Sequence, residues 1–585
     1  MERGLSARRE GSLREDNFGR VIAIFPTFVD TSEGEIMDMQ GRLPVGIQTF
    51  EDIRRRELCY VDKTKYVAQL ISSGFKSIFL SRPHRFGKSL FLSTLKAYFE
   101  GKKELFEGLY IAGVEDEIAR VQKREPWEER PVLYFDFNAT NYNAREALNE
   151  VLEQHLKKWE IIYGVERDRI SPERRFVHLL ESLYRKTGKQ VVILIDEYDK
   201  PLLETVTDET LNEANRTLLK AFYEVLKQCD SCIRFSILTG ITKFSKTTLF
   251  SGVNNLVDIT LVDDYAAICG FTAQELSTYF APEIEQLARN EESTVEETRA
   301  RLKKEYDGYL FSPEGESVYN PFSLLNVLTF SRFNYYWFET ATPSYLINYL
   351  KRTRVFVPSL DTDLKIGINA IQDFRYNAQD SVIPLLFQAG YLTIKSYLKQ
   401  ARLFQLGYPN EEVRFGFLEE LLPLYTSFIT RVNIEPTIWD LYEQLDRADL
   451  AGAMKQVEDI LAGILYGNIP NDESGRPLRE QYYQSVLYAV FRLLGLHAQA
   501  EVVCATGRVD MVVKTAHHLY IFEFKVTTQG TAQDAITQIK ERGYIKMFSS
   551  DDRPIHLVGV SFDEKTRNIG EWKEVLVPDG REVEK

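Results

Sequence analysis

The sequence of 585 residues predicts an α/β fold with two parts, a larger helix-covered parallel sheet and a smaller α/β domain near the C-terminus. Three observations support this prediction. From residue 76 to about residue 270, short apolar runs alternate with longer helical stretches, which is typical of parallel strands. The following two hundred residues read mostly as amphipathic helices. Strands then return after residue 500, between two further helical segments.

The composition is that of a folded, water-soluble chain, with 44% hydrophobic and 27% charged residues. These values exclude a disordered, collagenous or coiled-coil class. Because 72 Lys and Arg face 86 Asp and Glu, the net charge of −14 argues against a generic polyanion binder, although it leaves room for a local basic groove. Five cysteines are too few for a disulfide framework and favour a reducing, cytoplasmic location. No apolar run reaches the ~18 residues that a membrane span needs.

The chain divides into four expected regions. Residues 1–42 are rich in charge and glycine, and we expect a poorly ordered extension that lacks the apolar stretch of a secretory signal. Met37 and Met39 leave open whether residues 1–36 belong to the native protein. Residues 43–270 should form the core with the parallel sheet, residues 271–470 a helical lid and connector, and residues 471–585 the second α/β domain.

The expected core strands are apolar runs that end in polar residues. They comprise residues 77–81, 131–137, 191–197 and 232–240, and a helix over 89–100 follows the first of them. In a parallel sheet the carboxyl ends of such strands share one edge, where ligands bind.

Residues 82–89 read RPHRFGKS and connect the first strand to its helix. Such a loop holds phosphate through backbone N–H groups and the helix N-terminus, while Lys88 reaches the β and γ phosphates of ATP and Ser89 ligates Mg²⁺. Arg82 stands where the usual pattern has its first glycine, so the match is incomplete, and a lone GKS also occurs at ordinary helix starts. The residues expected to line the nucleotide are Arg82, Arg85, Phe86, Gly87, Lys88, Ser89 and Leu90.

The strand VVILIDE at residues 191–197 supplies the second half of this predicted site. Asp196 is placed to hold Mg²⁺ through water, and Glu197 to polarise the attacking water. Thr239, at the end of a third strand, is placed to sense the γ-phosphate. Because two acids at the end of a buried strand are costly without a role, the set predicts ATP binding and turnover.

These segments, together with YVDKT at 60–64 and LTGITKFSKTTLFSGVNNLVDIT at 238–260, resemble the AAA-ATPase-like family that is often fused to a PD-(D/E)XK nuclease domain. The resemblance extends from about residue 43 to the C-terminus and implies a P-loop NTPase core with a helical lid. In that family the loop also lacks the first glycine and commonly has Arg where this chain has His84. The resemblance leaves the arginine finger unassigned, with Arg85, Lys243 and Lys246 as candidates.

A second set of polar residues lies in the C-terminal region. Asp510 is on one expected strand, and Glu523, Phe524 and Lys525 are on the next, over residues 519–526. Side chains alternate along a strand, so Glu523 and Lys525 share a face. This set suits metal-assisted phosphodiester hydrolysis, in which Asp510, Glu523 and the Phe524 carbonyl bind Mg²⁺ and Lys525 orients or helps to deprotonate water.

Two expected helices complete this second set. Glu480, one turn from Tyr483 on the helix over 478–495, is a candidate ligand through water. Gln538, with Arg542 one turn later on the helix over 531–548, is placed to address substrate phosphate or the water network. The D-x12-ExK spacing with these helices resembles the PD-(D/E)XK, restriction-endonuclease-like fold. An E/K pair on a strand is often only a cross-strand ion pair, but its apolar neighbours favour burial here.

We therefore expect an ATP-binding and ATP-hydrolysing protein with a Mg²⁺-dependent, nuclease-like domain that acts on DNA and is gated by the nucleotide state. The alternative is a nucleotide-dependent switch or scaffold whose nuclease-like domain binds nucleic acid or protein without cleaving. A third possibility is ATP-driven DNA translocation. Nucleic acid is the expected partner, no membrane is expected, and a homo-oligomer stays open.

Overall fold

The computed structural model describes most of the chain after residue 42. The described ranges are 43–138, 141–167, 171–243, 256–337, 364–372, 382–430, 432–464, 479–495, 499–502, 510–527, 530–548, 551–563, 565–566 and 568–577, with single positions 346, 350 and 360. All of them belong to one unit that spans residues 42–585. The expected N-terminal extension lies outside the described residues.

The first sheet is parallel and has five strands in the order β2-β3-β4-β1-β5. Its strands are β1 (Ser77–Ser81), β2 (Val132–Asp136), β3 (Val191–Asp196), β4 (Ile233–Gly240) and β5 (Leu256–Asp258). Every residue of β1 and β3 is buried, as a sheet covered on both faces requires. The parallel sheet predicted from the sequence is thus confirmed.

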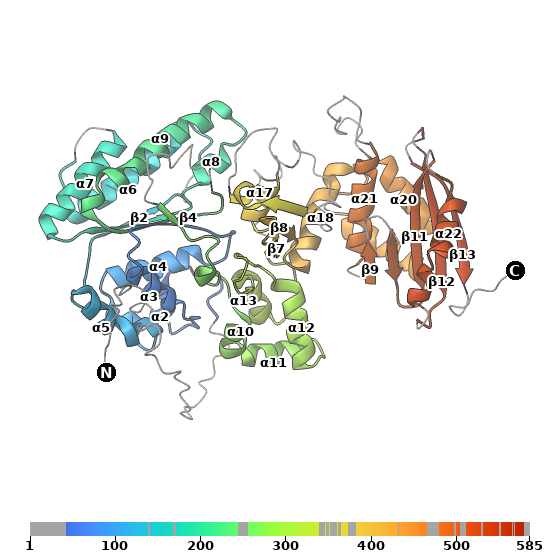
Figure 1. The fold of residues 1–585 in the computed structure, drawn as a ribbon, viewed down its shortest axis with the longest axis horizontal. Helices are drawn as coiled ribbons and strands as arrows, with labels where there is room; N and C mark the ends of the chain where they lie inside the picture. Colours follow the sequence, from blue (N-terminus) through green and yellow to red (C-terminus); the bar gives the residue numbers. More distant parts are fainter. Residues whose placement is uncertain are drawn as a thin grey trace, which may run out of the picture. The chain divides into compact units, whose positions relative to one another are not determined.

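Helices cover both faces of this sheet (Figure 1). One face carries α6 (Ala147–Tyr163), α7 (Pro172–Thr187), α8 (Lys200–Glu204) and α9 (Glu209–Gln228), and the other carries α2 (Phe50–Arg55), α3 (Thr64–Ser72), α4 (Lys88–Phe99) and α5 (Tyr110–Gln122). Local signals set their ends: α7 starts with a proline in its first turn and stops at Gly188, which has a left-handed backbone.

The strand order determines which loops meet. β4 lies between β1 and β3, and the register pairs Leu80 with Thr239 and Ile195 with Leu238. The carboxyl ends of the three strands therefore lie at one edge of the sheet. As a result, the loop after β1 and the acids at the end of β3 come together although about 110 residues separate them in the chain.

The middle of the chain is mainly helical, as expected. Its helices are α10 (Ala273–Tyr279), α11 (Ala281–Asn290), α12 (Val295–Tyr306), α13 (Pro321–Phe330), α16 (Ile368–Gln372), α17 (Ile383–Gln388), α18 (Glu411–Tyr425), α19 (Ile434–Asp446) and α20 (Leu450–Ala462). Complete capping boxes begin α10 at Thr272 and α12 at Thr294.

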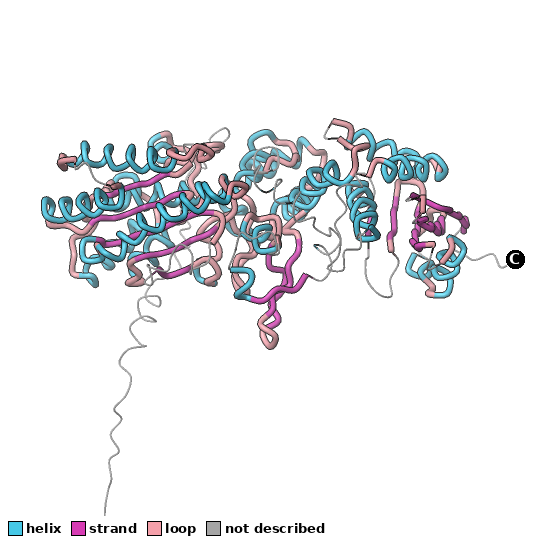
Figure 2. The backbone as a smooth tube through the Cα atoms, turned by 90° about the horizontal axis from the view of Figure 1, so that it is seen from above, coloured by secondary structure: helices cyan, strands magenta, loops and turns pink. Residues whose placement is uncertain are grey.

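This region also contains a three-stranded antiparallel sheet that the sequence pattern did not predict. Its order is β6-β8-β7, with β6 (Leu364–Gly367), β7 (Thr393–Leu398) and β8 (Leu403–Gly407). β7 and β8 form a hairpin (Figure 2). In β8 the alternation of buried and partly exposed side chains is limited to Phe404 and Leu406 and their neighbours, and in β7 a register shift interrupts it. The alternation of apolar and polar residues that predicts a strand is therefore too short to recognise in the sequence.

The second sheet is mixed and has the order β13-β12-β11-β10-β9. Its strands are β9 (Gln499–Val502), β10 (Met511–Lys514), β11 (Leu519–Val526), β12 (Ile555–Asp563) and β13 (Asn568–Val577). β11 and β12 pair in parallel and the other neighbours are antiparallel. The sequence did not predict β13. The helix expected over 531–548 ends earlier, as α22 (Ala532–Glu541), because Gly543 adopts a positive φ of 66°.

Each face of the second sheet packs against helices. Met511, Val513, Tyr520 and Phe522 join the main apolar core, which includes side chains of α19, α20 and α21 (Arg479–Leu494). Residues of the opposite face, such as Ile521 and Leu557, pack against Ile539 of α22. Within the described part of the chain, no helix has the length and apolar character that crossing a membrane would require.

We predict that Gly559→Ala destabilises the second sheet. A Cβ at this position would lie 2.1 Å from the carbonyl oxygen of Ala532, so α22 would have to move away from β12. Overpacking of this kind lowers the free energy of unfolding by about 1–3 kcal/mol. Calorimetric melting should show a lower Tm, whereas Gly113→Ala, on an exposed face of α5 with no atom near the new Cβ, should leave it unchanged or raise it. Equal Tm values for Gly559→Ala and the wild type would contradict the prediction.

Candidate functional site

The loop between β1 and α4 has the geometry of a phosphate-binding loop. Gly87 precedes the first residue of α4 and has a φ of 91°, which favours glycine. A Cβ at Gly87 would meet no atom within 4 Å, so space is open beside the loop. The main-chain N–H of Arg82 donates to the Gly240 carbonyl and ties the start of the loop to β4. The N-terminus of α4 therefore faces an open position suited to an anion.

Lys88 is the first residue of α4, and its side chain is buried against the loop. The Nζ donates to the carbonyl oxygens of Arg82, at 3.1 Å, and Pro83, at 3.2 Å, and lies 3.1 Å from Oε1 of Glu197. Burial alone would lower the pKa of Lys88, but the carboxylates of Glu197 and Asp196 outweigh it and raise that pKa. Lys88 is therefore a fixed positive charge at the helix N-terminus.

Asp196 is at the centre of a hydrogen-bond network at the end of β3. Thr239 Oγ1 donates to its Oδ1 at 2.8 Å, Tyr134 OH donates to its Oδ2 at 3.1 Å, and the Ser89 hydroxyl also bonds this carboxylate. Burial, followed by the negative charge of Glu197, raises the pKa of Asp196. A divalent cation would relieve this repulsion, so Ser89 and Asp196 fit a Mg²⁺ ion.

Glu197 follows β3 in a left-handed backbone conformation, with a φ of 51°. Its side chain is buried and its carboxylate points to Lys88. The structure thus brings together Lys88, Ser89, Asp196, Glu197 and Thr239, which the sequence predicted from three separate segments. We call these five residues the first site.

The other predicted loop residues contact protein groups. The buried guanidinium of Arg82 donates to the carbonyls of Ser81, Thr260 and Tyr265 and stacks on Phe311, with its Cζ 4.2 Å from the ring centroid. Burial lowers the pKa of Arg82 to about 10. The Arg82 side chain therefore holds the loop against residues 260–265. The predicted contact of Arg82 with the nucleotide would come from its main chain.

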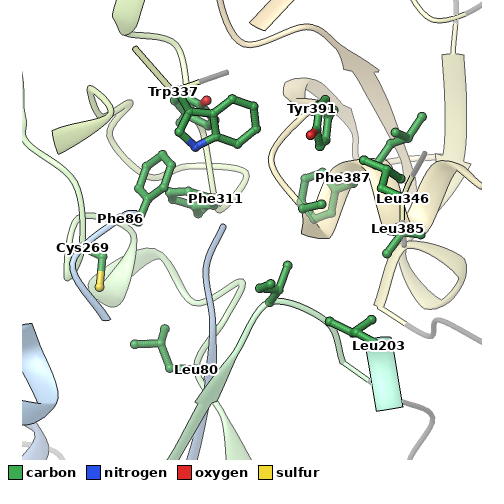
Figure 3. Close-up of a cluster of buried hydrophobic side chains, with 14 of the residues drawn as sticks. Leu80, Phe86, Leu203, Cys269, Phe311, Trp337, Leu346, Leu385, Phe387 and Tyr391 are labelled. Carbon is green, nitrogen blue, oxygen red and sulfur yellow. The ribbon is translucent and has the colours of Figure 1, made fainter. Parts of the chain in front are cut away.

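Aromatic contacts support the rest of the loop. The Arg85 guanidinium lies 3.9 Å from the ring centroid of Phe322, and Phe86 packs edge-on against Tyr309 and Phe311. Phe86, Phe311 and Trp337 come from three segments and lie together (Figure 3). The indole Nε1 of Trp337 donates to the His84 carbonyl at 3.3 Å. Leu90 is half-buried on α4.

The candidates for an arginine finger are not free in the described part of the chain. Arg85 is held on Phe322, and Lys243 forms an ion pair with Asp258. Lys246 lies outside the described residues.

The second site consists of Asp510, Glu523, Phe524, Lys525 and Gln538. Oδ2 of Asp510 accepts a hydrogen bond from the Phe524 N–H at 2.8 Å, which links the start of β10 to β11. Lys525 Nζ donates to Oε1 of Gln538 at 2.5 Å and lies 3.7 Å from Oε1 of Glu523. The same oxygen of Glu523 accepts a hydrogen bond from the Gln538 amide. Gln538 thus bridges the carboxylate and the amine that the sequence placed on one face.

Glu523 carries the unfavourable electrostatics of this second site. It is 2% exposed, and its Oε2 has no hydrogen-bond partner among the described residues. Burial, followed by the charge of Asp510, raises the pKa of Glu523 to about 7, and burial also raises the pKa of Asp510. The unpartnered oxygen and the paired acids fit a divalent cation held by Asp510, Glu523 and the Phe524 carbonyl.

The other predicted members of the second set are Arg542, whose positive charge acts to lower the pKa of Asp510 and of Glu523, and Glu480 and Tyr483. Glu480 and Tyr483 lie on α21, but their side chains are outside the described part. Arg542 is exposed and donates to Tyr544 OH at 3.1 Å. No group of three or more His, Cys, Asp or Glu side chains that could hold a metal ion occurs within the ranges that the structure describes. The two carboxylates therefore need the main-chain carbonyl and water to complete a coordination sphere.

Two residues at the first site were missed by the sequence analysis. Tyr134 belongs to β2, and its partial burial next to Asp196 follows from the strand order, which the sequence does not reveal. Asp199 lies three residues after Asp196 and is fully buried. Its signal in the sequence is the third acid of IDEYDKP, close after a buried strand.

Comparisons with known proteins match both parts of the chain. The family described as "Predicted AAA-ATPase" (AAA-ATPase-like) matches residues 44–250, and the PD-(D/E)XK nuclease superfamily matches residues 478–572. A relative from Azotobacter chroococcum mcd 1, named "Uncharacterized protein in vnfD 5'region", is 37% identical over 537 residues, which cover 90% of this chain and 98% of the relative. The first site falls in the first matched segment and the second site in the second.

Solved structures of two archaeal proteins also align with the chain, with 10% identity in each case. Cdc6p from Pyrobaculum aerophilum aligns with a TM-score of 0.23 over 63% of this chain and 93% of its own. The ORC2 protein of Aeropyrum pernix, in ADPNP–ADP complexes, aligns with a TM-score of 0.17 over 62% and 91%.

The raised pKa of Glu523 predicts a pH-dependent stability. The folded protein holds this proton more tightly than the unfolded chain, because the pKa rises from 4.5 to about 7. The resulting stabilisation is complete below about pH 4.5 and is lost as the pH rises through about 7, with an upper bound of about 3 kcal/mol. In metal-free buffer, the Tm of the wild type should fall relative to that of Glu523→Gln between pH 5 and 8. The exposed variant Glu541→Gln is the control, and its Tm should keep a constant difference from that of the wild type between pH 5 and 8. If the Tm difference between the wild type and Glu523→Gln were equally constant, the prediction would be contradicted.

Proposed function

We propose that this chain, which belongs to the AAA-ATPase-like family and carries a C-terminal PD-(D/E)XK nuclease superfamily domain, hydrolyses ATP at the first site and cleaves DNA at the second. The observation that carries the proposal is the convergence of Lys88, Asp196, Glu197 and Thr239 at one sheet edge beside an open loop. A cation, a pair of acids and a hydroxyl that anchors one of these acids are parts that suit phosphoryl transfer to water.

In the proposed ATPase reaction, Lys88 leaves Glu197 to bind the β and γ phosphates, and the N–H groups of residues 85–89 bind further phosphate oxygens. Ser89 and Asp196 would hold Mg²⁺, which neutralises the charge that develops on the phosphates. Glu197, released from Lys88, accepts a hydrogen bond from the attacking water and orients it. Thr239 stays bonded to Asp196 and keeps that carboxylate in place.

At the second site, Asp510, Glu523 and the Phe524 carbonyl would hold Mg²⁺, which supplies a Lewis acid and an activated water. Lys525 is placed by Gln538 to orient the water that attacks the phosphodiester. The unpartnered oxygen of Glu523 supports this assignment, because it leaves one oxygen of a buried carboxylate, next to Asp510, available to a cation.

We further propose that a chain of contacts links the nucleotide state to the second site. Trp337 donates from its indole to the His84 carbonyl in the loop and from its main-chain N–H to Oε1 of Glu412, at 2.8 Å. Glu412 is buried at the start of α18, which contacts α21. Phe491 of α21 lies 5.6 Å, between ring centroids, from Phe522 of β11. A shift of the loop on ATP binding can therefore reach the second sheet through packed groups.

A second candidate is a nucleotide-dependent switch or scaffold whose nuclease-like domain binds nucleic acid or protein without cleaving. The observation that favours it is the small ligand set of the second site, where the described side chains supply only the carboxylates of Asp510 and Glu523. Under this candidate, a protein in which Asp510 or Glu523 is substituted would bind the same partner as the wild type.

The ATPase proposal predicts different defects for two substitutions. Lys88→Ala removes the phosphate-binding cation and should weaken ATP binding at least ~100-fold in isothermal titration. Glu197→Gln keeps the fold and the phosphate contacts, so it should bind ATP but hydrolyse it ~10²–10³-fold more slowly. Glu209→Gln, on the exposed start of α9, is the matched control for phosphate release. Wild-type turnover by Glu197→Gln would refute the role of Glu197.

The nuclease proposal predicts that Glu523→Gln and Lys525→Ala each lower Mg²⁺-dependent cleavage at least ~100-fold. Double-stranded, single-stranded and branched DNA should be tested with and without ATP, with Glu541→Gln as the exposed control. If the nucleotide gates cleavage, Lys88→Ala should retain the basal rate and lose the response to ATP. If the wild type cleaved none of these DNA forms, and so did not differ from Glu523→Gln and Lys525→Ala, the switch or scaffold would be favoured. DNA-stimulated ATPase without cleavage would favour translocation.

A further inference from the structure

We infer that Asp199 is a positioning residue for ATP hydrolysis, which holds Glu197 in its working conformation by fastening two segments together. One segment is the acidic turn, residues 196–199, at the end of β3. The other is the β4 exit, residues 240–242, directly after Thr239. This inference rests on the proposed ATPase function, and it assigns to Asp199 a role that neither Asp196 nor Glu197 fills.

The Asp199 carboxylate makes the connection between the two segments. Its Oδ2 accepts three hydrogen bonds from the β4 exit, from the main-chain N–H of Ile241 at 3.1 Å and from the N–H and the hydroxyl of Thr242, each at 2.6 Å. The side chain is fully buried, so water does not compete for these bonds. One oxygen atom of Asp199 thus accepts hydrogen bonds from all three of these donors, which directly follow β4, the strand that carries Thr239.

Tyr198 closes the same junction from the neighbouring position. Its main-chain N–H donates to the Thr239 carbonyl at 3.0 Å, and its hydroxyl donates to the Thr242 carbonyl at 2.8 Å. Gly240 lies inside this bracket, where a Cβ would come within 2.4 Å of Asp199 Oδ1 and 2.6 Å of the Tyr198 ring. The acidic turn and the β4 exit are therefore packed as closely as a residue without a side chain allows.

Glu197 needs such support because its backbone is strained. A φ of 51° is disfavoured for a residue with a Cβ, and it persists only where neighbouring contacts determine it. The residues that follow Glu197 supply these contacts, namely Tyr198 and Asp199 through the β4 exit and Lys200, whose N–H donates to the Glu197 carbonyl. This turn aims the Glu197 carboxylate at Lys88.

The geometry distinguishes positioning from direct catalysis. Oδ2 of Asp199 is engaged with Ile241 and Thr242, and Oδ1 faces Gly240, where it has no hydrogen-bond partner among the described residues. Burial, followed by the charge of Glu197, raises the pKa of Asp199 to about 6, which agrees with a carboxylate close behind Glu197. Asp199 therefore acts through the backbone of its neighbour.

Three variants of the full chain test this inference. Asp199→Ala removes all three hydrogen bonds and should lower kcat for ATP hydrolysis about 10–100-fold, the range expected for a displaced catalytic group. Asp199→Asn keeps an acceptor oxygen for Ile241 and Thr242 and should stay within about 5-fold of the wild type. Thr242→Val removes one donor and should fall between them. The Kd for ATP should change less than about 3-fold in all three, because Lys88 and the loop are untouched.

Three results would overturn the inference. Wild-type kcat in Asp199→Ala would show that the junction does not position Glu197. An equal loss in Asp199→Asn and Asp199→Ala would show that the negative charge, and not the hydrogen-bonded geometry, is required. A loss of ATP affinity together with kcat in every variant would indicate a merely structural role and would also overturn it.

Hydrogen–deuterium exchange separates this inference from the proposed ATPase function. Asp199→Ala should speed exchange in peptides that cover residues 195–203 and 238–243, with Asp208→Asn, at the exposed start of α9, as the control. Faster exchange in a protein whose wild type releases no phosphate would support the junction and refute the ATPase function. Unchanged exchange in both peptides would overturn the junction, whatever the ATPase rate.

Discussion

The buried charge of Lys88 is the constraint on which the first site depends. An ammonium group that is removed from water is strongly destabilising unless acceptors surround it. The fold supplies them from two places, the carbonyls of Arg82 and Pro83 in the loop after β1 and the carboxylate of Glu197 after β3. One side chain thus ties together segments about 110 residues apart in the chain, and the position of β4 between β1 and β3 sets the distance that it spans.

The second site also buries charge, but here the buried charge is negative, whereas that of Lys88 at the first site is positive. Asp510 and Glu523 are brought close in a poorly solvated place, and the nearest cation, Lys525, is shared with Gln538. The first site carries its own cation, Lys88, whereas the second has an excess of negative charge that a bound cation would relieve. This difference explains why the carboxyl of Glu523 binds a proton so readily, while Lys88 keeps its own.

The features that were predictable from the sequence are those encoded over short distances. The apolar runs that became β1, β3 and β11, the RPHRFGKS loop and the D-x12-ExK spacing are local patterns, and the family resemblance they carry is confirmed. The strand order, the contact of Tyr134 with Asp196 and the inward side chain of Arg82 depend on pairing between distant segments, which a local pattern does not contain. β13 escaped prediction because Val577 is its one buried residue and charged residues interrupt its apolar positions, so the alternation along its sequence is weak.

Arg82 replaces the glycine usual in such loops, and its anchoring has a consequence for cooperativity. A loop that begins with glycine can loosen by itself, since no side chain ties it to a neighbour. Here the guanidinium grips carbonyl oxygens both at Ser81 and in residues 260–265, so neither segment can open without breaking the bonds of the other. The loop and the chain after β5 therefore behave as a single opening unit, so their backbone amides are expected to exchange with solvent in the same opening event.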